Sequence, residues 1–223
     1  MLLENLPDEL FLKIFHYLSH YDLIHALYNL NTRLNNVTHS VKISIDLTPM
    51  QCPPAIDYYT PLYQNRVTYA KFLNYCQNIL PNVEHHLISL KLSNRDTANA
   101  CDLFNTWFEI KNYSNIEILT LTDPSVLMVI KLKYLEHLTT LYIEFDFNST
   151  MLKYILCEQM ISLKKCTLIN VNIFCQTLNL SEINKSNVEI LSIDRHTTLF
   201  IDDLFLLFHF MPKLKHLECS YKG

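Results

Sequence analysis

The sequence predicts an α/β fold in which short parallel strands alternate with helices, preceded by a three-helix segment at the N-terminus. A pattern of three apolar columns recurs six times after residue 83, and a helix-like stretch follows most recurrences. Ahead of this array, residues 1–40 carry apolar side chains at three- and four-residue spacing, which is typical of amphipathic helices.

The six recurrences are LISLKL, IEILTL, LTTLYI, LKKCTL, VEILSI and LKHLEC. Successive members of the first column lie 22 to 29 residues apart, and they are Leu87, Ile116, Leu138, Leu163, Val188 and Leu214. The second column holds Leu90, Leu119, Leu141, Cys166, Leu191 and Leu217, and the third holds Leu92, Leu121, Ile143, Leu168, Ile193 and Cys219. Because alternate side chains of a strand point to opposite faces, columns two and three share one face. We therefore expect one strand per recurrence and a continuous apolar core beneath the strands.

The stretches between the recurrences predict helices at residues 102–111, 125–136, 151–160, 174–183 and 201–210. A period in the twenties with an L-x-x-L-x-L strand and a following helix resembles the leucine-rich repeat. The resemblance covers residues 83–223 and implies a short solenoid of parallel strands and helices. Leucine-rich repeats usually place an asparagine three residues after the third column. This sequence has no asparagine there, and the five positions hold Arg95, Pro124, Asp146, Val171 and His196. A generic α/β domain with amphipathic strands is the alternative.

Residues 41–82 are predicted to connect the two parts. VKISIDL alternates apolar and polar residues and predicts a strand. A proline-rich loop follows, and apolar residues at helical spacing then predict a helix at residues 69–80 that Pro81 ends. The predicted organisation is therefore 1–40, 41–82 and 83–223.

Three short helices are expected within residues 1–40. Pro7, followed by the acidic Asp8 and Glu9, is typical of a helix start, and Asn31 is a candidate N-cap for the third helix. The apolar residues of the first helix sweep an arc of roughly 220°, about twice the stripe that a helix needs to cover its own core. The surplus apolar surface predicts that the first helix contacts something besides its own core.

This segment resembles the F-box. The matching residues are Leu6, Pro7, Glu9, Leu10, Ile14, Phe15, Tyr17, Leu18, Asp22, Leu23, Ala26, Asn31 and Arg33, whereas Leu34 replaces the tryptophan that usually follows the arginine. The resemblance implies that one side of the helices binds a Skp-type adaptor, which links to a cullin scaffold in SCF ubiquitin ligases. It implies an adaptor-binding set of Leu6, Pro7, Leu10, Ile14, Leu18, Leu23 and Leu27, and an internal set of Phe11, Phe15, Ala26, Leu30 and Leu34.

The expected function is therefore that of a substrate-recognition subunit of an SCF-type (cullin-RING) E3 ubiquitin ligase, without catalytic residues of its own. A target protein would bind the outward residues of the strands, which are Lys91, Thr120, Tyr142, Thr167, Ser192 and Glu218, flanked by Glu144, Ile169 and Asp194. This mixed surface does not identify the target. The alternatives are a leucine-rich interaction scaffold, whose N-terminal helices only cap the array, and a small hydrolase in a divergent α/β domain.

Composition excludes several other classes. The net charge is −4 and no run of Lys or Arg occurs, which argues against nucleic acid or an anionic membrane as partner. The single glycine, Gly223, leaves no phosphate-binding loop, and the histidines lack the companions of a metal site, so we expect no cofactor or metal. The seven cysteines never form C-x-x-C and no apolar stretch approaches about 18 residues, which favours a cytoplasmic or nuclear protein.

Overall fold

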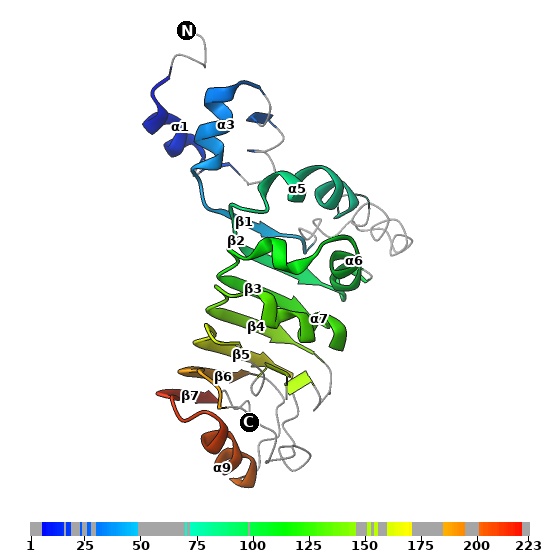
Figure 1. The fold of residues 1–223 in the computed structure, drawn as a ribbon, viewed down its shortest axis with the longest axis vertical. Helices are drawn as coiled ribbons and strands as arrows, with labels where there is room; N and C mark the ends of the chain where they lie inside the picture. The colour runs from blue at the N-terminus through cyan, green and yellow to red at the C-terminus, as the bar shows by residue number, and fades with distance from the viewer. Residues whose placement is uncertain are drawn as a thin grey trace, which may run out of the picture.

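A computed structural model of the chain describes residues 6–15, 17–18, 23, 26–27, 30–48, 70, 72–97, 99–145, 151–152, 154–155, 160–170, 185–194 and 201–219. In this part of the chain, seven strands form one open, all-parallel sheet in the order β1-β2-β3-β4-β5-β6-β7. The strands are β1 (Ile43–Asp46), β2 (Leu87–Ser93), β3 (Ile118–Thr122), β4 (Thr140–Glu144), β5 (Lys165–Ile169), β6 (Ile190–Asp194) and β7 (His216–Cys219). Figure 1 shows them stacked in chain order along the long axis.

Helical segments connect the strands, because parallel neighbours require a crossover rather than a tight turn. The described segments are η2 (Tyr75–Ile79), α5 (Leu80–Val83), α6 (Ala100–Trp107), η3 (Ile110–Tyr113), α7 (Val126–Lys131), η4 (Leu132–Tyr134) and α9 (Ile201–Phe210). Helices α5, α6 and α7 line one side of the sheet (Figure 1). The helix predicted at 201–210 is confirmed. The helix predicted at 102–111 begins earlier, at Ala100, and its last part is the separate 3₁₀ segment η3.

The three apolar columns are confirmed as rows of the sheet core. Second-column residues pair in register from Leu90 on β2 through to Leu217 on β7, and third-column residues pair from Leu92 to Cys219. From β2 to β6 every column residue is almost completely buried. Together with apolar residues of the helices they form one continuous core cluster, which stabilises the stack by removing apolar surface from water.

The strand predicted within VKISIDL is confirmed as β1, and it belongs to the same sheet. Ile45 pairs with Leu90 and Asp46 with Lys91, while Ile43 and Ile45 enter the core cluster. The sheet therefore begins before the boundary that the sequence suggested at residue 83.

The prediction that Pro81 ends a helix is wrong. A π-helical turn, η2, leads directly into α5, and Pro81 occupies the first turn of α5. A proline is tolerated there because the first backbone N–H groups of a helix have no acceptor within it. The predicted helix at 125–136 is split into α7 and η4, with Ser125 as its N-cap. Residues 151–152 and 154–155 of the helix predicted at 151–160 are helical, and the helix predicted at 174–183 lies outside the described residues.

Two N-terminal helices, α1 (Asp8–Phe15) and α3 (Thr32–His39), lie beyond β1 at one end of the sheet (Figure 1). Asn31 caps α3 as predicted, since its side-chain oxygen accepts a hydrogen bond from the Leu34 backbone N–H at 2.8 Å. The predicted middle helix is described only at residues 23, 26 and 27, which are helical. We call the described residues from Leu6 to Ser40 the N-terminal unit.

Candidate functional site

The N-terminal unit has an apolar cluster of its own. Its buried members are Phe11, Phe15, Leu23, Leu27, Leu34 and Val37, and none of them belongs to the core cluster of the sheet. The helices therefore fold around their own small core rather than laying an apolar face on the strands.

Arg33 of α3 joins that helix to α1 and to the segment before it. Its Nε donates to Asp8 Oδ1 at 2.9 Å, and its Nη2 donates to the Leu6 carbonyl oxygen at 2.5 Å. The guanidinium carbon also lies 5.7 Å from the centroid of the Phe11 ring, within the range of a cation–π contact. The segment just before α1, which contains Leu6 and Pro7, is thus held beside the two helices.

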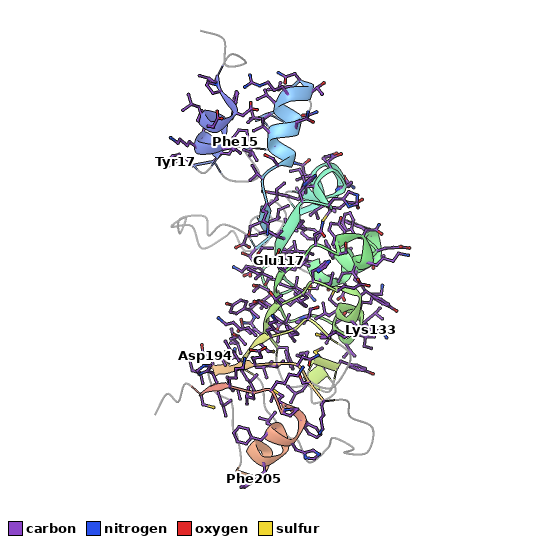
Figure 2. All side chains as sticks on the ribbon, turned by 60° about the vertical axis from the view of Figure 1, so that its left-hand side comes forward. Phe15, Tyr17, Glu117, Lys133, Asp194 and Phe205 are labelled. Carbon is purple, nitrogen blue, oxygen red and sulfur yellow. The ribbon has the colours of Figure 1, made fainter. Side chains whose placement is uncertain are left out.

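Most of the residues that the resemblance assigns to the adaptor lie at the surface. Leu10, Ile14 and Leu18 keep 43%, 40% and 36% of their area exposed, Pro7 is exposed, and Leu6 is half-buried. Two further large apolar residues, Leu12 and Tyr17, are also exposed and were not in the predicted set. The i, i+4 spacing that marked Leu10 and Ile14 could not have found Leu12, because a two-residue offset places Leu12 on a different side of the helix. Figure 2 places Tyr17 beside Phe15, at the end of α1.

The division into adaptor-facing and internal residues is wrong at four positions. Leu23 and Leu27 were assigned to the adaptor surface, but both are buried in the N-terminal cluster. Ala26 and Leu30 were assigned to the interior, but both are exposed. Residues 23 and 27 stand four apart and share one helical face, and that face turns toward the cluster around Phe11 rather than toward solvent.

On the sheet, the predicted target-binding residues form one continuous row. Lys91, Thr120, Tyr142, Thr167, Ser192 and Glu218 are paired in register from β2 to β7. Asp46 of β1, which was not in the predicted set, pairs with Lys91 and extends the row to all seven strands. A second row holds Thr122, Glu144, Ile169 and Asp194. We call the sheet face that carries these rows the outer face. Figure 2 places Asp194 on the opposite side of the sheet from Lys133.

Several outer-face side chains already interact with one another. Lys91 Nζ lies 3.1 Å from Asp46 Oδ2, and Ser192 Oγ donates to Glu218 Oε2 at 3.3 Å. Lys165 Nζ lies 5.5 Å from the centroid of the Tyr142 ring. Tyr142 therefore presents a cation-covered aromatic ring near the middle of an otherwise hydroxyl-rich row.

At the carboxyl end of the strands, Arg95 binds two acidic residues. Its Nη1 donates to Glu144 Oε1 at 2.7 Å, and its Nε donates to Asp123 Oδ2 at 3.1 Å. Asn170 Nδ2 also donates to Glu144 Oε1, at 2.8 Å. These hydrogen bonds raise the pKa of Arg95 above its usual range, first through Glu144 and then through Asp123. Glu144, which was predicted to face a target, thus also accepts hydrogen bonds from residues that follow two other strands.

The turns after the strands use polar residues one position earlier than the leucine-rich resemblance implied. Asp123 and Asn170, each two residues after the third column, have positive φ angles of 50° and 58°. Asn and Asp tolerate this left-handed region better than most residues. Asn94, at the same position after β2, accepts from the Cys101 N–H at 2.7 Å and donates to the Asp123 carbonyl at 2.8 Å. Periodicity at this offset could have revealed these residues.

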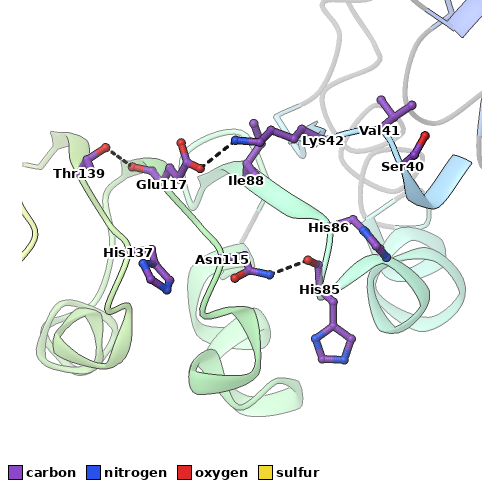
Figure 3. A pocket seen from close by; sticks show the side chains of 10 residues that line it. All are labelled: Ser40, Val41, Lys42, His85, His86, Ile88, Asn115, Glu117, His137 and Thr139. Atoms are coloured by element: carbon purple, nitrogen blue, oxygen red, sulfur yellow. Dashed lines mark hydrogen bonds and ion pairs between the residues drawn. The ribbon is translucent and has the colours of Figure 1, made fainter. Parts of the chain in front are cut away.

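An open hollow of about 520 Å³ lies at the other end of the strands, beside the N-terminal unit (Figure 3). Several of its lining side chains form ion pairs or hydrogen bonds with neighbouring residues. Lys42 Nζ lies 3.1 Å from Glu117 Oε1, and Asn115 Nδ2 donates to the His85 carbonyl at 2.6 Å. Ser40, which lines the hollow together with His85, His86 and His137, donates its hydroxyl to the Val37 carbonyl at 2.7 Å. Over the described residues, no group of three or more His, Cys, Asp or Glu side chains could hold a metal ion.

The buried cysteines are poor nucleophiles. Desolvation by burial raises the pKa of the Cys76, Cys101 and Cys166 thiols to about 12, from an ordinary value of 9.0. The reactive thiolate is therefore scarce near neutral pH. These three side chains fill the core and do not mark a catalytic site.

Comparison with models of known protein families and with curated proteins finds no match for this chain. Among the described helices, none has both the length and the apolar character needed to cross a bilayer. Two surfaces of the molecule are candidates for binding: the exposed apolar side of α1 and the outer face of the sheet.

Proposed function

We propose that the chain is a substrate-recognition subunit of an SCF-type cullin-RING ubiquitin ligase. In this proposal the N-terminal unit is an F-box that binds a Skp-type adaptor, and the sheet with its helices is a leucine-rich-repeat-like solenoid that binds a target protein. The adaptor would connect the chain to a cullin scaffold, and catalysis would belong to the conjugating enzyme that the scaffold recruits.

The observation that carries the proposal is the exposed apolar side of α1 on a unit that has a buried apolar cluster of its own. Phe11 and Phe15 fill the N-terminal cluster, while Leu10 and Ile14 on the same helix remain over one third exposed. Full burial of a large apolar side chain contributes roughly 1.5–3 kcal/mol, so several partly exposed ones together can drive association. Exposed apolar clusters of this kind mark protein-binding sites.

The separate cluster also favours the F-box over a simple cap. A helical cap would bury its apolar face against the first strands, and its buried residues would join the core of the array. The N-terminal cluster and the sheet core instead share no residue. A unit with a buried cluster of its own can offer its remaining exposed apolar side chains to a second protein.

Two features of the sheet support the solenoid and its role. The strands follow chain order, and the apolar columns continue in register from β2 to β7. The N-terminal unit occupies one end of this long stack (Figure 1), so an adaptor bound there would leave the outer face accessible to a target.

The proposal is tested by measuring the affinity of the purified chain for a Skp-type adaptor. Leu10→Ala/Ile14→Ala removes two exposed apolar side chains from α1 and keeps residues that favour a helix. We expect the dissociation constant to rise at least about tenfold, which corresponds to about 1.4 kcal/mol. Circular dichroism should remain unchanged because neither side chain is buried.

The matched control is Leu127→Ala/Ile161→Ala, which changes the same residue types at two exposed sites on the sheet domain. It should bind the adaptor like the wild type. A folded wild-type chain that fails to bind any Skp-type adaptor would contradict the proposal and favour the scaffold alternative. Equal losses in both double variants would show that general surface apolarity, not α1, drives the binding.

A further inference from the structure

The C-terminal end of the sheet presents an open strand edge. β7 pairs with β6 on one side, and within the described residues no strand pairs with its other side. The backbone groups along such an edge can pair with another strand. An interaction at this edge would not involve the N-terminal unit, which lies at the opposite end (Figure 1).

The apolar columns lose their cover at β7. Leu191 and Ile193 on β6 are 0% and 4% exposed. Their register partners on β7 differ, since Leu217 is only half-buried and Cys219 is exposed. Leu214, the first-column residue ahead of β7, is also only half-buried. The core thus continues to the edge of the sheet and is incomplete there.

Helix α9 adds apolar surface at the same end. Leu207 and Phe210 point into the core, whereas Phe205 and Phe208 are 70% and 51% exposed. Figure 2 shows Phe205 at the extremity of the molecule, far from Phe15 and Tyr17. Two exposed phenylalanines therefore lie at the same end of the sheet as the open edge of β7.

The sequence of β7 is self-complementary. If two β7 strands pair antiparallel about a two-fold axis at Leu217, each His216 lies opposite Glu218 of the partner subunit. Both residues belong to the outer face, because His216 pairs with Ile190 and Glu218 with Ser192 in the register of β6. An imidazole can donate to a carboxylate, and Glu218 can accept a further hydrogen bond besides that from Ser192. The two Leu217 side chains would meet on the core side.

We propose that a second copy of this chain binds the β7 edge, so that two sheets join in an antiparallel pair across a two-fold axis. Edge pairing alone buries little surface, and the phenylalanines of α9 supply apolar area toward the roughly 1,200 Å² of a specific interface. The N-terminal units would then lie at the two distal ends of the dimer. This inference stands independently of the proposed ligase function.

The test is sedimentation velocity of the full chain between about 1 and 100 μM. We expect a monomer–dimer equilibrium in the micromolar range. His216→Glu places two carboxylates opposite each other at both cross-strand positions and should raise the dissociation constant at least about tenfold. The double variant His216→Glu/Glu218→Lys restores opposite charges and should restore dimerisation. Both residues are exposed, so the variants should fold.

His137→Glu is the matched control, because His137 is an exposed histidine shortly before β4, the middle strand of the sheet, and lies away from the β7 edge. It should sediment like the wild type. A wild-type chain that stays monomeric at 100 μM would overturn the proposal. A dimer that His216→Glu does not weaken, or that the charge exchange does not restore, would overturn the antiparallel β7 interface.

Discussion

Arg95 and Glu144 form a hydrogen-bonded ion pair of 2.7 Å across 49 residues of sequence. Arg95 follows β2 and Glu144 ends β4, so the pair spans the intervening strand β3. The same guanidinium binds Asp123, which follows β3. One side chain thus connects three consecutive strands at their carboxyl ends, where each chain segment leaves the sheet.

Arg95→Met should destabilise the fold by about 0.5–1 kcal/mol. The magnitude is modest because both partners are partly exposed and solvent weakens their attraction. Urea denaturation of Arg95→Met, Glu144→Gln and the double variant measures the coupling between the two side chains. Strictly additive effects would show that the pair contributes nothing to stability.

Truncation of a central core residue should cost far more than truncation of the same residue type at the edge. Leu141→Ala removes a fully buried side chain on β4 and should lower the free energy of unfolding by about 3–5 kcal/mol. Leu217→Ala changes a half-buried residue on β7 and should cost under about 2 kcal/mol. Urea denaturation of both variants, at concentrations where the chain is monomeric, measures the two losses of stability. Equal losses would contradict the finding that the apolar residues of β7 are only partly buried.

Phe15→Ala should unfold the N-terminal helices without weakening the sheet, because the two apolar clusters share no residue. Hydrogen exchange should accelerate by at least about 100-fold in α1 and α3 and stay unchanged in β3, β4 and β5. Leu141→Ala serves as the reciprocal control. Faster exchange throughout the sheet in Phe15→Ala would favour helices that cap the array.

Alkaline pH should destabilise the protein through its buried thiols. The pKa of Cys166 is raised by burial to about 12 in the folded state, above its ordinary value of 9.0. Its contribution to stability is therefore fully present below pH 9 and is lost as pH rises from 9 toward 12. Between pH 9.5 and 11, Cys166→Ala should lose stability less steeply than the wild type, by about 1 kcal/mol per pH unit. Identical slopes in urea denaturation would contradict this assignment.

The strand array was predictable because every repeat places its second-column residue three positions after the first-column residue and its third-column residue two positions later, although the repeats differ in length. The α3 start was predictable because Asn31 satisfies a free backbone N–H of the helix. The continuation past Pro81 was missed, since local sequence does not reveal that a π-helical turn ends there and a new helix starts.

At the candidate site, sequence pattern located the apolar surplus on α1 but did not fix the orientation of every residue. Leu23 and Leu30 are both leucines of the predicted middle helix, but Leu23 is helical and buried, whereas Leu30 lies in a turn and is exposed. Only packing against Phe11 and Leu34 decides which is buried. The Arg95 contacts were also missed, because they join residues of three different repeats and depend on the sheet register.

The central claim is that α1 of the N-terminal unit binds a Skp-type adaptor. Hydrogen exchange of the full chain, with and without a saturating Skp-type adaptor, tests binding and its location in one measurement. We predict slower exchange in Asp8–Phe15 and the residues just after it, with little change in β3, β4 and β5. No protection anywhere, or protection confined to the sheet, would contradict the account.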